Sequence, residues 1–313
     1  MRDYVQLTRF PNVFTALADV TMGFLFVHAG LRPLETYFCL AAASMTLYMA
    51  GMVLNDVWDV EQDRQERPSR PIAAGRIPLV QARRVGFGLL CSGVVLGWAA
   101  GYVASIEWAT AWRSGLAATM LALLIVLYDA HIKRTPLGPL AMGGCRSLNV
   151  LLGMSLIGSE STSALLPGFS AVQLLVAGGV GLYIAGVTWF ARREARTSTR
   201  WQLAAAMAVM VGGIGLLGLV YRGLPTETPR MIAHEATWWL LLGLLTFTII
   251  RRCVMAFFDP SPRRVQLAVT NAIWSLIVLD AAVVLLACHF AWALLVVAFL
   301  LPTMFLGRWV EST

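Results

Sequence analysis

Long apolar segments alternate with short polar segments along almost the whole chain. Each apolar segment has about 17–25 residues, enough for a helix to cross a hydrocarbon core of about 30 Å. The pattern therefore predicts an all-α, polytopic helical membrane protein with nine or ten transmembrane helices. We place the spans near residues 12–31, 35–54, 85–104, 113–130, 138–158, 171–190, 201–221, 235–255, 265–287 and 289–307.

The composition excludes the main soluble classes. Of the 313 residues, 58% are hydrophobic and only 13% are charged, and the mean hydropathy is +0.71. A soluble chain of this size could not bury so much apolar surface, so soluble-enzyme, disordered and nucleic-acid-binding classes are excluded. The longest polar stretch runs only from Asn55 to Arg84. We therefore expect one transmembrane domain over residues 1–313.

The basic residues predict an orientation. The net charge is +7, and most of the 24 Lys and Arg residues lie in alternate loops. Four arginines fall in the loops of the opposite side, namely Arg32, Arg113, Arg222 and Arg230. Loops rich in Lys and Arg stay in the cytoplasm. We expect an integral protein of the plasma membrane, with its N-terminus and long polar loops cytoplasmic, membrane lipids around it and no nucleic-acid partner.

Acidic residues follow the second apolar segment at helical spacing. If the helix continues past Asn55, then Asp56, Asp59 and Asp63 stand at i, i+3 and i+7 on one face. Carboxylates so close together repel one another unless a cation lies between them. Mg²⁺ suits this arrangement, because it binds a few carboxylates and completes its shell with water and phosphate oxygens. The three aspartates are therefore candidate metal ligands, with Asn55 beside them.

A plainer interpretation stays open for this acidic segment. In a solvated helix at the membrane surface, the same carboxylates would pair with Arg64, Arg67 and Arg70. The position favours the functional interpretation, because charge that directly adjoins an apolar span is costly and marks a candidate site.

Three motifs carry a resemblance to a known family. The first is Asn-Asp-x-x-Asp-x-x-x-Asp over residues 55–63, followed by Arg-Pro-Ile-x-x-Gly-x-Ile over residues 70–77. The other two motifs are Arg-Phe-Pro-Asn at residues 9–12 and Tyr-Asp-Ala-His-Ile-Lys-Arg at residues 128–134, and their order and spacing along the chain match those of the same family. The chain resembles the UbiA-type intramembrane prenyltransferases. The resemblance implies nine transmembrane helices, so a tenth would be a C-terminal addition.

The resemblance also implies an activity and roles for residues. It implies Mg²⁺-dependent transfer of a prenyl group from a polyprenyl diphosphate to an aromatic or other lipophilic acceptor, with Asp56, Asp59 and Asp63 as catalytic metal ligands. The residues that it places on the substrate are Asn12, Asn55, Arg70, Tyr128, Lys133 and Arg134. In physical terms, cationic groups and metal would stabilise negative charge on the leaving diphosphate.

The chain departs from the family at the second acidic motif. The aspartates expected after the sixth helix fall on Ala191 and Ala195. Glu194 is the remaining candidate metal ligand, and Arg192 and Arg193 could hold the diphosphate directly or lie among lipid headgroups. The loss of a two-metal arrangement puts ordinary catalysis in doubt.

Two polar residues lie deep in the fifth apolar segment. Arg146 and Asn149, at i and i+3, share one helix face. An unpaired arginine there costs several kcal/mol, so we expect Arg146 to face a polar cavity, with Asp19, Asp280 or a substrate anion as its partner. Arg146 and Asn149 are therefore candidate substrate-binding residues, and the alternative is a buried structural pair of Arg146 with an aspartate. Their Cys-Arg-x-Leu-Asn segment is similar to that of a divergent EboC-like branch of the family.

Aromatic residues could line the site of an allylic cation. The candidates are Trp58, Tyr128, Trp189 and Phe190, and the alternative for each is a place in the interfacial aromatic belt.

Two functions besides prenyl transfer are compatible with the sequence. A carrier or transporter of an isoprenoid or other anionic lipid would keep the binding face without the chemistry, although no inverted repeat supports it. A scaffold in a biosynthetic complex is the third interpretation.

Overall fold

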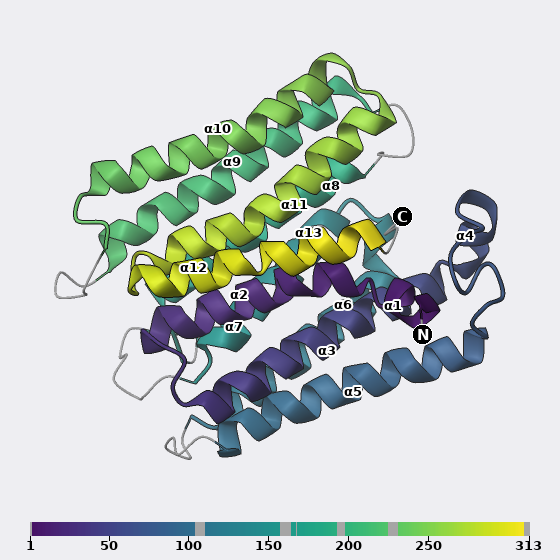
Figure 1. The fold of residues 1–313 in the computed structure, drawn as a ribbon, viewed down its shortest axis with the longest axis horizontal. Helices are drawn as coiled ribbons and strands as arrows, with labels where there is room; N and C mark the ends of the chain where they lie inside the picture. The colour runs from purple at the N-terminus through teal and green to yellow at the C-terminus, as the bar shows by residue number, and fades with distance from the viewer. Residues whose placement is uncertain are drawn as a thin grey trace.

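The computed structural model describes residues 2–103, 110–156, 164–166, 168–192, 198–224 and 231–309. Its long helices run side by side in one bundle (Figure 1). The helices are α1 (Arg2–Leu7), η1 (Phe10–Asn12), α2 (Val13–His28), α3 (Leu34–Trp58), α4 (Val60–Glu66), α5 (Leu79–Val103), α6 (Trp112–Ala130), η2 (Ile132–Arg134), α7 (Gly138–Met154), α8 (Ala171–Ala191), α9 (Arg200–Gly223), α10 (Glu235–Phe258), α11 (Pro262–Val284), α12 (Phe290–Ala298) and α13 (Leu300–Trp309). Two short strands, β1 (Ala164–Leu166) and β2 (Phe169–Ser170), pair antiparallel before α8.

The prediction of a polytopic helical protein is confirmed. Within the described ranges, nine spans are long and apolar enough to cross a bilayer, and the 17-residue α7 runs beside them. The last predicted span, near 289–307, corresponds to the span Phe290–Gly307, which is divided into α12 and α13 by a turn at Phe299. Pro302 explains the break: it has no N–H to donate to the carbonyl of Ala298, and its ring clashes with that carbonyl.

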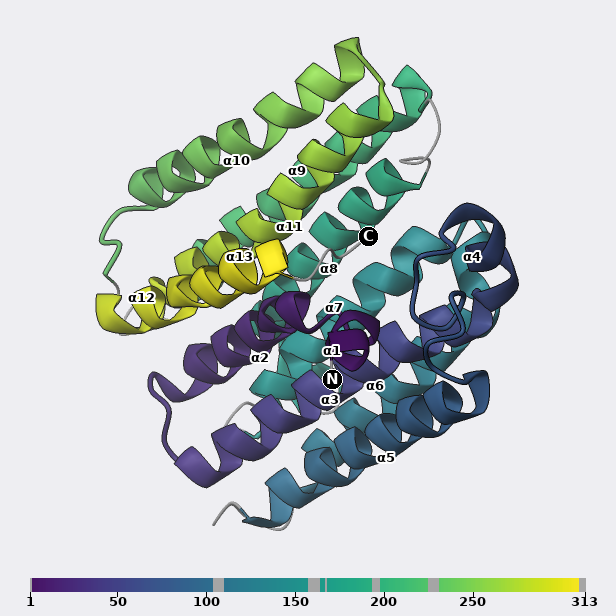
Figure 2. The ribbon, with the colours of Figure 1, turned by 45° about the vertical axis from the view of Figure 1, so that its right-hand side comes forward.

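The helix order brings distant parts of the sequence together. α3 packs on α5, α7 packs between α6 and α8, and α10 packs between α9 and α11. α2 contacts α3, α7 and α11, so the N-terminal and C-terminal parts of the bundle meet along it. Figures 1 and 2 show α4 at one end of the bundle, which we call the α4 end. Because the chain alternates direction, α6 finishes and α7 begins at this same end.

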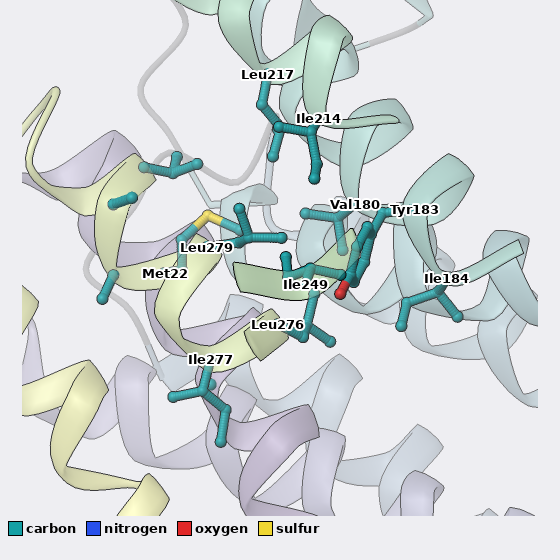
Figure 3. Packing of buried hydrophobic residues seen from close by; sticks show 14 of the residues in the cluster. Met22, Val180, Tyr183, Ile184, Ile214, Leu217, Ile249, Leu276, Ile277 and Leu279 are labelled. Carbon is teal, nitrogen blue, oxygen red and sulfur yellow. The ribbon is translucent and has the colours of Figure 1, made fainter. Parts of the chain in front are cut away.

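The largest group of buried apolar side chains joins α2, α8, α9, α10 and α11. In Figure 3, Met22, Tyr183, Leu217 and Leu276 lie within it. Tyr183 is fully buried, and its hydroxyl donates a 2.8 Å hydrogen bond to the carbonyl oxygen of Ala272 in α11. This bond satisfies the one polar atom of the Tyr183 side chain and fixes α8 against α11.

Glycines allow α2 and α7 to approach closely. A Cβ atom at Gly23 would lie 2.5 Å from the carbonyl oxygen of Val150, and one at Gly153 would lie 2.3 Å from that of Val20. Small residues at such crossings let the backbones of membrane helices come into contact. The close α2–α7 crossing places polar residues of the two helices within hydrogen-bond distance of each other.

Candidate functional site

A cavity of about 470 Å³ lies inside the bundle and opens at the α4 end. It is lined by residues of α2, α3, α4, α6, α7, α8 and α11 and by Arg9 and Asn12, which precede α2 in the chain. Its polar outer end is formed by Arg9, Asn12, Asn55, Asp59, Gln62, Asp63, Glu66, Arg67, Arg70, Tyr128 and Asp129. Its apolar walls are formed by Ala16, Leu47, Gly51, Met52, Leu121, Ile125, Met142, Ile184, Val187, Val269 and Ile273.

The acidic segment bends at the boundary between α3 and α4. The helical hydrogen bonds continue through the bend, because the amide of Asp59 donates to Asn55 and the amide of Asp63 donates to Asp59. The expected continuation past Asn55 therefore holds to Trp58, where α3 ends and the bend at Asp59 changes direction. Across this bend, Asp56 and Asp63 share one basic partner, while Asp59 has different partners.

Asp56 and Asp63 share one arginine. Nη1 of Arg70 lies 3.0 Å from Oδ1 of Asp56 and 2.7 Å from Oδ2 of Asp63, and all three side chains are buried. Nη2 of Arg9 approaches the same oxygen of Asp56 at 3.3 Å. Two carboxylates and two guanidinium groups are thus gathered in one charged cluster, of which Asp63, Arg70 and Arg9 line the cavity and Asp56 lies behind them.

Asp59 pairs with the chain segment that follows α6. Its Oδ2 lies 2.7 Å from Nζ of Lys133, and its Oδ1 accepts a 3.1 Å hydrogen bond from Nη2 of Arg134. Asp59 and Lys133 are largely buried, whereas Arg134 is exposed. The structure thus brings the first motif and the basic part of the 128–134 motif together at the α4 end.

Asp129 belongs to the site although the sequence analysis did not select it. Its Oδ1 accepts a 2.8 Å hydrogen bond from Nδ2 of Asn55, and both residues line the cavity beside Tyr128. The sequence carried a signal, because Asp129 stands inside the motif that contains Tyr128. Only the packing of α6 against α3 shows that its carboxyl group faces the first motif.

The inner end of the cavity holds a polar cluster from α2, α3 and α7. Nη1 of Arg146 donates to Oδ2 of Asp19 at 2.7 Å, and its Nη2 donates to Oγ1 of Thr15 at 2.8 Å. The expected pairing of Arg146 with Asp19 is confirmed, and both Arg146 and Asn149 line the cavity. The guanidinium group also lies over the ring of Tyr48, 5.6 Å from its centroid.

Asn149 connects the helices around this cluster. Its Nδ2 donates to the carbonyl oxygen of Ala16 at 2.8 Å and to Oδ2 of Asp19 at 3.3 Å. Its Oδ1 accepts a 2.7 Å hydrogen bond from Oγ of Ser44, which also lines the cavity. Asp280, the other expected partner of Arg146, is fully buried in α11 beside the cluster.

Several predicted site residues do not line the cavity or lie outside the residues that the structure describes. Arg192 is exposed, and its Nη2 donates to the carbonyl oxygens of Arg134 and Thr135 at 3.3 and 3.0 Å. Arg193 and Glu194 lie outside the described residues. Ala191, where the resemblance leads us to expect an aspartate, lines the cavity, so this wall has a methyl group instead of a carboxylate.

The aromatic candidates separate into different environments. Tyr128 lines the cavity. Trp58 packs edge-on against Phe87, and Phe190 is buried in the core with Trp189 packed against it. None of these three residues is among those that line the cavity. Tyr48, which the sequence analysis did not select, lines the cavity instead.

The cavity has the donor chemistry that Mg²⁺ requires. In the described part of the chain, no three Asp, Glu, His or Cys side chains converge on one point as a complete metal site. Mg²⁺ needs fewer protein ligands, because it retains waters and binds substrate phosphates. Asp59 and Asp63 present carboxylates to the cavity next to Asn55, whose amide nitrogen is used by Asp129 and whose oxygen can face a cation. This set of hard oxygen donors fits the ion.

Comparison with protein families gives a match over most of the chain. A family model described as the UbiA prenyltransferase family matches residues 16–259. A digeranylgeranylglyceryl phosphate synthase from Ignicoccus hospitalis is 31% identical over 155 residues, which are 49% of this chain and 46% of that protein. One from Methanoculleus marisnigri is 30% identical over 158 residues, 50% of this chain and 52% of that protein. The chain thus spans about half the length of these relatives.

Solved structures share the fold. A UbiA homolog from Aeropyrum pernix K1 superposes with a TM-score of 0.61 at 21% identity, covering 86% of this chain and 96% of that one. A UbiA homolog from Archaeoglobus fulgidus bound to GPP and Mg²⁺ superposes with a TM-score of 0.55 at 14% identity, covering 95% of this chain and 99% of that one. At these identities the likeness concerns the arrangement of helices.

Proposed function

Because the chain belongs to the UbiA prenyltransferase family, we propose that it is a membrane-embedded, Mg²⁺-dependent prenyltransferase that moves a prenyl group from a prenyl diphosphate to a lipophilic acceptor. The observation that carries the proposal is the division of the cavity into a charged outer end and apolar walls. A prenyl diphosphate has the same division, with a charged diphosphate and a hydrocarbon chain.

The outer end would bind the diphosphate. Arg9, Arg67 and Arg70 line it, and guanidinium groups form strong charge-assisted hydrogen bonds to phosphate oxygens. Arg70 is already fixed by its two carboxylate partners, so its position does not depend on the substrate. Groups held in place in this way stabilise the charge that develops on the leaving diphosphate without further reorganisation.

Asp59 and Asp63 would hold Mg²⁺, with Asn55 and Asp129 beside them. The ion, when bound, would neutralise diphosphate charge and so make the diphosphate a better leaving group. In the structure, Lys133 and Arg134 hold Asp59, and Arg70 holds Asp63. These basic partners balance the carboxylates. Arg70 also lines the cavity, whereas the structure shows Lys133 and Arg134 only on Asp59.

The apolar walls would hold the prenyl chain and exclude water. Leu47, Ile125, Met142, Ile184 and Ile273 come from five different helices, so apolar side chains line the cavity from several sides. Exclusion of water protects an allylic cation from hydrolysis. The rings of Tyr48 and Tyr128 offer it electron-rich faces.

The inner polar cluster would orient the acceptor. Arg146 is balanced by Asp19, so the cluster has little spare positive charge for an anionic group. Ser44 and Asn149 add a hydroxyl and an amide to the cavity wall. This environment suits a neutral hydroxyl group, and we therefore propose a lipophilic, hydroxyl-bearing acceptor. The relatives named digeranylgeranylglyceryl phosphate synthases support a prenylated glycerol derivative as the product class.

The same proposal includes the orientation in the plasma membrane. Arg9, Arg70, Lys133 and Arg134 gather at the α4 end, and basic residues stay on the cytoplasmic side. A water-soluble prenyl diphosphate headgroup would then enter from the cytoplasm.

Reconstitution tests the function. The protein in liposomes would be incubated with labelled prenyl diphosphates of several chain lengths, Mg²⁺ and hydroxyl-bearing lipid acceptors, and products would be identified by mass spectrometry. The proposal predicts a prenylated lipid and released diphosphate in equal amounts. Movement of labelled lipid across the bilayer without diphosphate release would instead indicate a carrier.

A further inference from the structure

A second, smaller groove of about 290 Å³ lies between α10 and α11. Arg251, Arg252 and Met255 of α10 line it on one side, and Arg264, Leu267 and Ala268 of α11 line it on the other. None of these residues lines the central cavity. α10 lies at the edge of the bundle farthest from α5 (Figures 1 and 2), so the groove belongs to a different surface from the proposed active site.

Two of its arginines carry charge without an acidic partner. Arg251 and Arg252 are exposed, and neither forms an ion pair or hydrogen bond with any side chain that the structure describes. Arg264 differs, because its Nε lies 2.8 Å from Oδ2 of Asp259 and both side chains are about half exposed. The groove therefore has a surplus of positive charge and guanidinium donors that are free to bind an anion.

The depth of the arginines indicates where that anion comes from. Arg251 is seven residues before the end of α10 at Phe258, which is about 10 Å along the helix. An apolar helix as long as α10 puts this position near the boundary of the hydrocarbon core, where an unpaired arginine is costly. An arginine at this depth extends its side chain towards lipid phosphates. A lipid headgroup is therefore the nearest source of a counter-ion.

Apolar side chains continue the groove towards the middle of the bilayer. Met255 and Leu267, which line the groove itself, are 47% and 50% exposed. Leu244 and Phe247, which lie on the other side of Arg251 along α10, towards the middle of the bilayer, are 58% and 66% exposed. Only 22% of the apolar window of α10 is buried. A charged groove next to an exposed apolar helix face matches a molecule with a phosphate group and acyl chains, and a free phosphate would leave the apolar part unused.

We propose that the groove between α10 and α11 binds the phosphate group of an anionic phospholipid, with the acyl chains along the exposed face of α10. The phosphate accepts hydrogen bonds from Arg251 and Arg252, with Arg264 at the opposite wall. The site is independent of prenyl transfer, because the catalytic proposal uses none of its residues. Its role is to hold a lipid at α10 and so fix α10 and α11 in the membrane.

Native mass spectrometry of the full-length protein with defined lipids tests the proposal. The probes are phosphatidylglycerol, phosphatidylcholine and inorganic phosphate, and the variant is R251Q/R252Q. The control is R83Q/R84Q, which removes an adjacent exposed arginine pair near the start of α5. Wild type and the control should retain phosphatidylglycerol more strongly than phosphatidylcholine, whereas R251Q/R252Q should lose about tenfold or more of this retention, as expected for lost charge-assisted hydrogen bonds.

Three results would overturn the proposal. The wild type could retain phosphatidylglycerol and phosphatidylcholine equally, or R251Q/R252Q and R83Q/R84Q could lose phosphatidylglycerol to the same extent. The third is displacement of phosphatidylglycerol from the wild type by millimolar inorganic phosphate. A measurement on the wild type alone covers the case in which R251Q/R252Q does not fold. A photoreactive phosphatidylglycerol should label peptides of α10 and α11, and labelling that avoids both helices would equally contradict the site.

Discussion

Nη1 of Arg70 lies 3.0 Å from Oδ1 of Asp56 and 2.7 Å from Oδ2 of Asp63, so one guanidinium nitrogen joins two buried carboxylates seven residues apart. This contact connects the end of α3, the helix α4 and the loop that follows α4. It balances the charge of the acidic motif and places Arg70 at the mouth of the cavity. The acidic motif is therefore part of an ordered charge cluster at the end of the bundle.

Replacing Arg70 by Leu should destabilise the protein and abolish prenyl transfer. Asp56 and Asp63 would remain buried without their shared partner, and removal of one member of a buried ion pair costs about 3–5 kcal/mol. Thermal unfolding in detergent should show a clearly lower Tm. Arg64→Gln is the matched control, because Arg64 pairs with Glu61 in the exposed part of α4 and should change neither Tm nor turnover. An unchanged Tm for Arg70→Leu would contradict this role.

The pair Arg146 and Asp19 should behave as a unit. Arg146→Leu leaves the fully buried Asp19 without its guanidinium partner, and we expect a loss of about 3–5 kcal/mol in stability. The double variant Arg146→Leu and Asp19→Leu removes both charges, so it should recover much of that loss. A double-mutant cycle on the free energy of unfolding measures this coupling, and additive single-variant effects would show that the two residues do not interact.

The close crossing of α2 and α7 gives a prediction about packing. Gly23→Ala places a Cβ atom 2.5 Å from the carbonyl oxygen of Val150, so the two helices must separate. We expect a loss of about 1–3 kcal/mol and a raised KM for the acceptor, because Arg146 and Asn149 move with α7. Gly178→Ala in α8 is the control, since a Cβ there meets no atom within 4 Å. Similar stability of the two variants would contradict the crossing.

The spacing of Asp56, Asp59 and Asp63 was sufficient to predict their place at the end of an apolar helix. Arg146 was also predictable as a residue that needs a buried partner, because its cost in an apolar helix requires one. The alternation of apolar and polar segments predicts the spans, but it does not show the turn at Phe299 that divides the last one into α12 and α13.

Other parts of the site depend on contacts between helices that lie far apart in the sequence. The bond between Asn55 and Asp129 joins α3 to α6, and Tyr48 reaches the cavity because of the rotation of α3. A helical pattern shows which residues share one face, but it does not show which neighbouring helix that face meets. For the same reason the sequence does not show that Trp58 packs against Phe87 or that Phe190 lies in the core.

The most direct measurement is diphosphate release as a function of Mg²⁺ concentration, for the wild type and Asp59→Asn, with binding of the prenyl diphosphate measured in parallel. The account predicts that the wild type releases diphosphate only when Mg²⁺ is present and stops when a chelator removes it. The Asp59→Asn variant should fold and should still bind the prenyl chain through the apolar walls. Its turnover should fall by about 100-fold or more, which is the usual effect of losing a major electrostatic contribution to catalysis. Release that continues at the same rate without Mg²⁺, or in a folded Asp59→Asn variant, would contradict it.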